Sequence, residues 1–152
     1  SLNRKRSLFM FLGEHQHSLD TKGRITIPSK FRNELGDKFV ATKGLDNCIF
    51  LYPLSEWQEI ENKLNKLPVS RADVRSFVRF FFSGAAELEL DKQGRTVIPV
   101  NLREYAEIER DTVVIGVGSR IEVWSTAKWA EYNEMASSSF EEIAENLVDL
   151  GI

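Results

Sequence analysis

The sequence of 152 residues predicts an α+β, β-rich fold in which two tandem copies of one unit are joined and followed by helices. The first observation is an internal repeat, because a shift of 71 residues gives nine identities across residues 11–35. The second is the period-two alternation of apolar and polar residues in short segments, which is typical of half-buried strands. The third is the helical periodicity of apolar residues between the copies.

One motif dominates the repeat, Asp-x-x-Gly-Arg-x-x-Ile-Pro-x-x-(Phe/Leu)-Arg, at residues 20–32 and 91–103. Its Asp and Gly occupy the first and fourth positions of a tight turn, which both residue types favour. In the second copy an alternating segment, 86–90, precedes the turn, and β-rich segments follow the two turns at 24–27 and 95–98. The motif therefore predicts a strand, a turn and a second strand in each copy.

The other elements of each copy follow in order. Pro28 and Pro99 end the second strands and open a short helix, and Gly36 closes the first of these helices. Two further strand-like segments come next in each copy, at 38–43 and 48–52 in the first and at 112–117 and 121–124 in the second. Each copy is thus predicted to contain four short strands and one small helix.

Two helices are predicted between the copies. Ser55-x-x-Gln58 is a capping box, and the apolar stripe behind it ends at Pro68. Ser70 opens a second helix that runs to about Phe82. This helix has an arginine face and an aromatic face, made of Arg71, Arg75 and Arg79 and of Phe77, Phe80 and Phe81. We expect the arginines to be solvated, to form ion pairs between subunits or to contact phosphate, and the aromatic residues to pack between copies or subunits.

Two more helices are predicted after the second copy. Ser125 begins the first, and Ser139-x-x-Glu142 caps another that Gly151 closes. We expect the chain to divide into a leader or artificial extension (1–9), a first repeat (14–56), linking helices (57–84), a second repeat (85–128) and an acidic helical C-terminal segment (129–152).

The formal charge of −3 describes a weakly acidic chain, which as an average argues against binding nucleic acid. The charge is unevenly distributed, however, because residues 1–128 carry +3 and residues 129–152 carry −6. The acidic end is either a solvated helix face or a site for a partner. The single cysteine, Cys48, excludes an intramolecular disulfide and is typical of a cytosolic protein, and no apolar run is long enough to predict a membrane span.

The first repeated turn concentrates positive charge. Residues 20–32 carry a local charge of +3, from Lys22, Arg24, Lys30 and Arg32 against Asp20. A guanidinium can bind a phosphate, or the O6 and N7 atoms of guanine, through two parallel hydrogen bonds. The alternative is that Arg24 and Arg95 each pair with the Asp four residues earlier and only stabilise the turn. The residues alone leave both interpretations open.

The duplicated motif resembles the SpoVT-AbrB family of swapped-hairpin DNA-binding domains. The resemblance rests on residues 20–24 and 91–95, the two Ile-Pro pairs, Tyr52-Pro53-Leu54 and the helix end at 79–84. Two copies in a chain of this length are similar to a bacterial transcriptional regulator of that family. The resemblance implies two tandem swapped-hairpin repeats that form a small barrel. It also implies a ring-shaped homo-oligomer that binds short direct repeats in the promoter of the cell-division and cell-wall gene cluster.

In that family the arginine of each Asp-x-x-x-Arg element is linked to DNA contact, which corresponds to Arg24 and Arg95 in this sequence. Nearby residues are further candidates for contacts with phosphate: Lys22, Lys30, Arg32, Lys92 and Arg103. Arg32 and Arg103 have a structural alternative, since each follows an apolar residue on a short helix. We expect double-stranded DNA and further copies of the chain as partners, a cytoplasmic, nucleoid-associated location, and no catalytic residue, metal, cofactor, small-molecule substrate or membrane contact.

Other classes of protein remain as alternatives. An antitoxin-type protein of the same superfamily would bind DNA and a toxin. A small β-barrel enzyme is suggested by Gly118-Ser119, which resembles the self-cleavage dipeptide of pyruvoyl-dependent decarboxylases, although Gly-Ser is also a common turn. A protein that only mediates interactions would show no salt-dependent DNA binding. His15 and His17 share a strand face, an arrangement that suits two metal ligands, but they lack Cys or His partners at a useful spacing.

Overall fold

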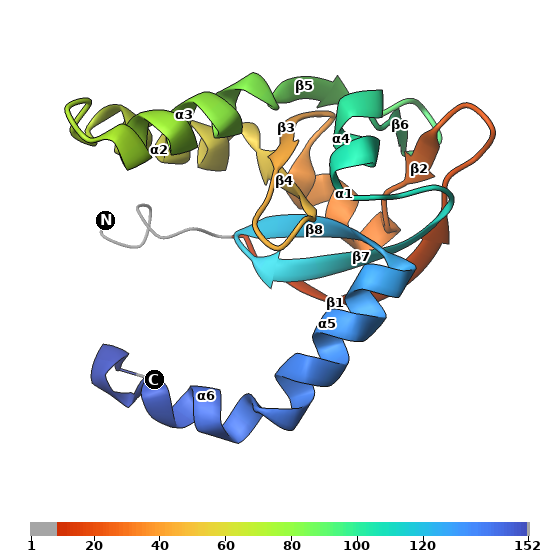
Figure 1. The fold of residues 1–152 in the computed structure, drawn as a ribbon. Coiled ribbons are helices and arrows are strands. Elements are labelled where there is room, and N and C mark those ends of the chain that lie inside the picture. The colour runs from red at the N-terminus through yellow and green to blue at the C-terminus, as the bar shows by residue number, and fades with distance from the viewer. Residues whose placement is uncertain (1–8, 152) are drawn as a thin grey trace, which may run out of the picture.

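The computed structural model describes residues 9–151, so most of the predicted leader lies outside the described residues. Within them an antiparallel sheet of order β1-β7-β8-β4-β3-β5 is covered on one face by a two-stranded ribbon, β2-β6 (Figure 1). The strands are β1 (Phe11–Ser18), β2 (Arg24–Thr26), β3 (Lys38–Lys43), β4 (Ile49–Pro53), β5 (Ala86–Glu89), β6 (Arg95–Val97), β7 (Asp111–Gly118) and β8 (Arg120–Ser125). The helices are α1 (Ser29–Leu35), α2 (Leu54–Asn65), α3 (Ala72–Ser83), α4 (Val100–Tyr105), α5 (Thr126–Ser138) and α6 (Phe140–Asn146).

The two copies exchange strands. The first strand of each copy pairs with the third strand of the other, β1 with β7 and β5 with β3. At the centre of the sheet β4 pairs with β8, and in the ribbon β2 pairs with β6. The strand order is therefore unchanged when the copies are interchanged, as a local twofold axis requires. This confirms the two tandem swapped-hairpin repeats, although β1 and β5 leave two open edges and the described sheet is not a closed barrel.

The main core lies between the sheet and the ribbon. Ile25 and Ile98 reach it from the ribbon segments, and Phe39, Leu51 and Ile121 reach it from the sheet; all five are fully buried. Ile98 is the isoleucine of the repeated Ile-Pro pair, and its counterpart Ile27 is also fully buried, so the two copies contribute equivalent residues to one core. Because strand exchange makes this core common to both copies, neither copy can bury its apolar residues alone.

A second apolar cluster covers the opposite face of the sheet. Phe50, Tyr52 and Trp124 project from β4 and β8, and Phe81 of α3 packs against them. The Trp57 ring of α2 stacks on Phe81 with 5.6 Å between ring centroids. The cluster attaches the α2–α3 hairpin to the sheet. Of the aromatic face of α3, Phe81 packs as expected against strands of both copies, whereas Phe77 and Phe80 are exposed.

Two predicted helix starts are wrong. α2 begins at Leu54 with Pro53 as its N-cap residue, so Ser55 lies inside the helix and makes no capping hydrogen bond. The φ of Pro53, −54°, is already suited to opening a helix directly at the end of β4. α3 begins at Ala72 rather than beside Ser70, with Arg71 at the N-cap.

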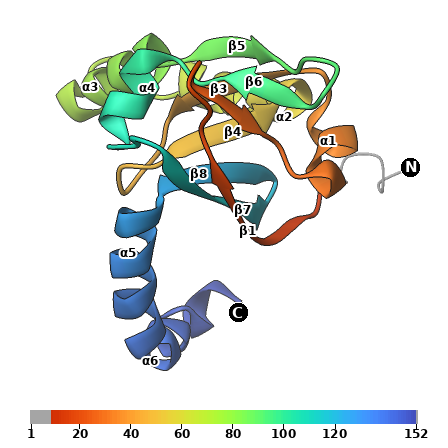
Figure 2. The ribbon, with the colours of Figure 1, turned by 90° about the vertical axis from the view of Figure 1, so that its right-hand side faces the viewer.

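The C-terminal helices agree better with the sequence. Ser125 caps α5, because its Oγ accepts a hydrogen bond of 3.0 Å from the amide of Lys128. Ser139 is the N-cap residue of α6 but its hydroxyl makes no cap bond, and a short 3-10 helix (Val148–Leu150) separates α6 from Gly151. α5 and α6 extend away from the sheet, with α6 turning back from the end of α5 (Figures 1 and 2). No helix within residues 9–151 combines the length and apolarity that crossing a bilayer requires.

Candidate nucleic-acid interface

The first repeated turn is organised by the carboxylate of Asp20. Its Oδ1 accepts hydrogen bonds of 2.9 Å from the backbone amides of Lys22 and Arg24. Its Oδ2 accepts a bond of 2.6 Å from Nε of Arg24. Gly23 completes the turn at φ +75°, a left-handed conformation that glycine adopts without strain. One aspartate thus fixes both the backbone of the turn and the direction of the arginine.

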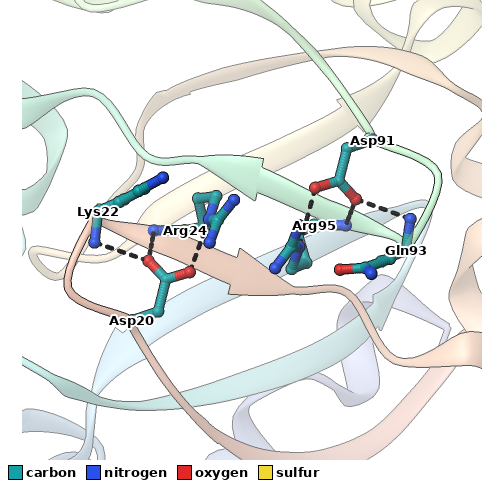
Figure 3. A network of polar contacts seen from close by, with 6 residues as sticks. All are labelled: Asp20, Lys22, Arg24, Asp91, Gln93 and Arg95. Carbon is teal, nitrogen blue, oxygen red and sulfur yellow. Dashed lines mark hydrogen bonds and ion pairs between the residues drawn. The ribbon is translucent and has the colours of Figure 1, made fainter.

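The second turn repeats this geometry in the other copy. Asp91 accepts bonds of 2.8 Å from the amide of Gln93, 2.9 Å from the amide of Arg95 and 2.8 Å from Nε of Arg95. Gly94 has φ +76°. Figure 3 shows the two Asp-Arg pairs on the adjacent strands of the ribbon. The Asp and Gly of the motif therefore perform the turn-forming roles that the sequence predicts.

The pairing of β2 with β6 brings both arginines to one face of the ribbon. Arg24 lies opposite Val97, and Thr26 lies opposite Arg95. Side chains directly opposite in a strand pair, and those two apart along a strand, share a face, so Arg24 and Arg95 are diagonal neighbours about 7–8 Å apart. The intervening residues, Ile25 and Thr96, point to the core and are buried. The ribbon thus presents two arginines, related by the local twofold axis, on its outer face.

Each arginine retains hydrogen-bonding capacity. Within residues 9–151 the bonds of the Arg24 and Arg95 side chains go to their aspartates through Nε, and their Nη atoms donate to no protein group. The side chains are 26% and 29% exposed. The Asp-Arg ion pair expected under the structural alternative is therefore present, but it leaves the outer edge of each guanidinium available. Pairing with Asp therefore orients each arginine and leaves its Nη donors unused.

The same contacts lower the pKa of both aspartates. The pKa of Asp20 falls to about 2, first because of the hydrogen bond from the Arg24 amide and then because of the Arg24 side chain. The pKa of Asp91 is lowered for the same reasons, through Arg95. Both carboxylates are therefore charged at neutral pH, and Lys22 and Lys92 on the exposed turns give the surface its excess of positive charge.

Arg32 and Arg103 are held differently. Nε of Arg32 donates to the carbonyl of Ile27 at 2.8 Å, and Nε of Arg103 donates to that of Ile98 at 3.1 Å. Each guanidinium also lies against the turn glycine of the other copy, Arg32 against Gly94 and Arg103 against Gly23. These contacts support the structural alternative for both residues, and their contact with DNA remains a prediction. The internal repeat gives one indication of this role, since the arginine and the turn glycine recur together in both copies.

The other predicted residues lie around the ribbon. Lys30 is exposed at the start of α1, with its ammonium 5.8 Å from the centroid of the Phe31 ring. Among the described residues, no group of three or more metal-ligating side chains forms around His15 and His17 or elsewhere. Gly118, at φ +74°, and Ser119 form the turn between β7 and β8.

The direct pairing of the two turn strands, β2 and β6, was not predicted from the sequence. This pairing brings together arginines that lie 71 positions apart in the chain.

Comparison with known proteins identifies the regulator that the sequence resembles. The family model described as "MraZ protein, putative antitoxin-like" matches residues 10–80 and again residues 81–151. A transcriptional regulator MraZ of Syntrophomonas wolfei is 77% identical over 143 residues, which cover 94% of this chain and the whole of that protein. Those of Desulforamulus reducens and Pelotomaculum thermopropionicum are each 60% identical, over 93% and 94% of this chain and 99% of their own lengths. The chain therefore belongs to the MraZ family.

Proposed function

We propose that this protein is a transcriptional regulator that binds double-stranded DNA through the outer face of the β2-β6 ribbon. The observation that carries the proposal is the pair of aspartate-oriented arginines, Arg24 and Arg95, with unused Nη donors on one exposed face. Guanidinium groups with this freedom bind phosphate or the guanine edge through two hydrogen bonds. The name of the relatives, transcriptional regulator, agrees with this role. The site of action would be the cytoplasm, on the nucleoid.

Binding by one small ribbon would be weak, so we propose that the protein acts as a ring-shaped homo-oligomer. α3 carries Arg75 and Arg79, whereas α6 carries Glu141, Glu142 and Glu145 and buries none of its residues in this chain. The opposite charges support contact between α3 of one protomer and α6 of the next protomer in the ring. A ring repeats the ribbon at regular intervals, so several ribbons can bind adjacent direct repeats with increased avidity. The proposed target is the promoter of the cell-division and cell-wall gene cluster.

Binding to a labelled promoter fragment tests this function. Fluorescence anisotropy at about 50 mM and about 200 mM salt should show tight binding that weakens by at least about tenfold at the higher concentration. A fragment of the same length with scrambled repeats should bind more weakly than the promoter. Equal affinity for both fragments, or no salt dependence, would contradict sequence-specific binding through arginine. Native mass spectrometry of the same sample measures the oligomer, and a monomer with undiminished affinity would contradict the ring.

The description of the family as putative antitoxin-like favours one second function, in which the protein binds a toxin as well as DNA. The exposed apolar residues of the α5–α6 segment, Met135, Phe140 and Ile143, would then contact the toxin rather than another copy. Size-exclusion chromatography of the purified protein distinguishes the two functions. A homo-oligomer that dissociates when these residues are substituted supports the ring. A monomer or dimer that forms a complex with the toxin through these residues supports the antitoxin.

A further inference from the structure

A groove of about 380 Å³ lies beside the ribbon, between β1 and the start of α1. Its polar lining is rich in groups that can carry positive charge or donate hydrogen bonds: His15, His17, Thr26, Ser29, Lys30 and Arg32. Among residues 9–151, no acidic side chain lines it. A concave surface with this lining is suited to an anion, because several donors converge where water is partly excluded.

Lys30 and His15 converge over Gly13. A Cβ atom at Gly13 would lie 3.3 Å from the Lys30 ammonium and 3.7 Å from Nε2 of His15. Gly13 also has φ +93°, which disfavours any other residue. Nε2 of His15 is shielded from solvent and has no hydrogen-bond partner among the described residues. A buried imidazole nitrogen beside a lysine therefore remains unsatisfied in this chain, which is unusual for a purely structural histidine.

The second copy lacks this chemistry. The shift of 71 residues replaces His15, His17 and Lys30 by Ala86, Leu88 and Asn101. A groove at a different place beside α4 contains Arg103, but it shares its lining with the carboxylates of Glu104, Glu107 and Glu109 and does not include β5. The second copy forms the same strand and helix without the two histidines and the lysine, so the fold of the unit does not require them.

The groove is continuous with the DNA-binding face proposed above. Thr26 lines the groove and lies directly opposite Arg95 in the ribbon, so their side chains share the outer face. We infer that the groove binds a phosphate group of the DNA backbone, and that protonation of His17 strengthens this binding. The inference rests on the proposed function, and it adds a site in one copy that makes the affinity for DNA dependent on pH.

The charges around the histidines determine the direction of the effect. Lys30 and Arg32 of α1 face the two histidines. The residues that pair with His15 and His17 on β7, Val114 and Thr112, are uncharged. Asp111 pairs with Ser18 and accepts a hydrogen bond of 3.0 Å from its hydroxyl, and it lines a second groove together with His17. Burial lowers the pKa of His17, with smaller effects from His15 and Arg32. His17 is therefore neutral in the free protein at pH 7. A bound phosphate favours the charged imidazole, so it raises the pKa of His17, and the imidazole takes up a proton on binding.

The test compares DNA affinity at about pH 6 and about pH 8. The variant carries the residues of the second copy, His15→Ala, His17→Leu and Lys30→Asn, and a second variant carries His15→Gln and His17→Gln in case the first fails to fold. The wild type should bind promoter DNA about three- to tenfold more tightly at the lower pH. Both variants should lose this difference and still bind through Arg24 and Arg95. The same pH dependence in the wild type and the Gln variant would overturn the inference.

Two further arms separate the possible causes of failure. If the wild type binds DNA at neither pH, the proposed function fails, and the inference fails with it. Titration of the protein with inorganic phosphate, followed through the imidazole NMR signals of His15 and His17, tests free phosphate as the ligand. Signals that shift with millimolar phosphate, together with pH-independent DNA binding, would overturn the DNA backbone as the ligand. Signals that shift with short duplex DNA and are unaffected by phosphate at equal concentration would support it.

Discussion

The guanidinium of Arg32 in the first copy lies against Gly94 in the turn of the second. A Cβ atom at Gly94 would lie 2.3 Å from Cζ of Arg32, closer than real Cβ atoms approach any heavy atom. The local twofold axis repeats the relation between Arg103 and Gly23, where the corresponding distance is 3.1 Å. The glycine of each turn thus serves the conformation of its own copy and the packing of the other. This reciprocal contact is one part of the interface between the copies, beside the exchanged strands and the shared core.

Replacement of Gly94 by Ala should destabilise the protein through both effects. The left-handed φ costs about 1 kcal/mol, and displacement of the Arg32 guanidinium adds about 0.5–1.5 kcal/mol through loss of its hydrogen bond to the carbonyl of Ile27. Gly118→Ala is the matched control, because Gly118 has nearly the same φ but, in the part of the chain that the structure describes, no atom beyond its chain neighbours lies within 4 Å of the added Cβ. Chemical denaturation should rank the losses as Gly94, then Gly23, then Gly118. Equal losses at Gly94 and Gly118 would show that the contact with Arg32 contributes nothing.

Arg32→Ala should lower stability more than Arg24→Ala. The first change removes the donor to the carbonyl of Ile27, a buried residue, and costs about 1–3 kcal/mol. The second removes a partly exposed ion pair, while the backbone bonds of Asp20 that form the turn remain. Thermal unfolding monitored by circular dichroism measures both variants. A larger loss for Arg24→Ala would mean that this arginine mainly stabilises the turn.

The carboxyl of Asp20 should titrate near pH 2. Because its pKa is lower in the folded protein than in the unfolded chain, its contribution to stability is complete above about pH 4 and is lost as the pH falls towards 2. NMR titration of the side-chain carbon measures the midpoint. In Arg24→Ala the midpoint should rise only partly, because the backbone amide at position 24, the largest cause, still donates to the carboxylate. An ordinary midpoint in the wild type would contradict the turn geometry.

Cys48 should be unreactive in the folded protein. Its side chain is fully buried and its thiol donates to the carbonyl of Leu45, and burial raises its pKa, so little thiolate forms at neutral pH. A disulfide reagent such as DTNB should label it at the rate of global unfolding, and rapidly in denaturant. Fast labelling of the native protein would show that the cluster around Phe50 and Trp124 opens locally.

Local features of this fold could be predicted from the sequence, and long-range ones could not. The turns at Asp20 and Asp91 follow from residues within five positions, so the repeat predicted them correctly. The start of α2 was mispredicted because two local signals compete there, and the φ of Pro53 prevails over the capping box of Ser55. The pairing of β2 with β6 joins distant segments, and no sequence pattern specifies it. The domain boundaries and the DNA contacts of the seven predicted basic residues remain predictions.

The role of the paired arginines is the central claim, and the double variant Arg24→Ala/Arg95→Ala tests it most directly. The control, Lys63→Ala/Lys66→Ala, removes two positive charges at the end of α2, in the hairpin opposite the ribbon (Figure 1). Fluorescence anisotropy with promoter DNA should show a loss of at least about 30-fold for the arginine variant, since each good arginine contact contributes about 1–3 kcal/mol, and little change for the control. Equal affinities of the wild type and the arginine variant, with both variants folded, would contradict the account.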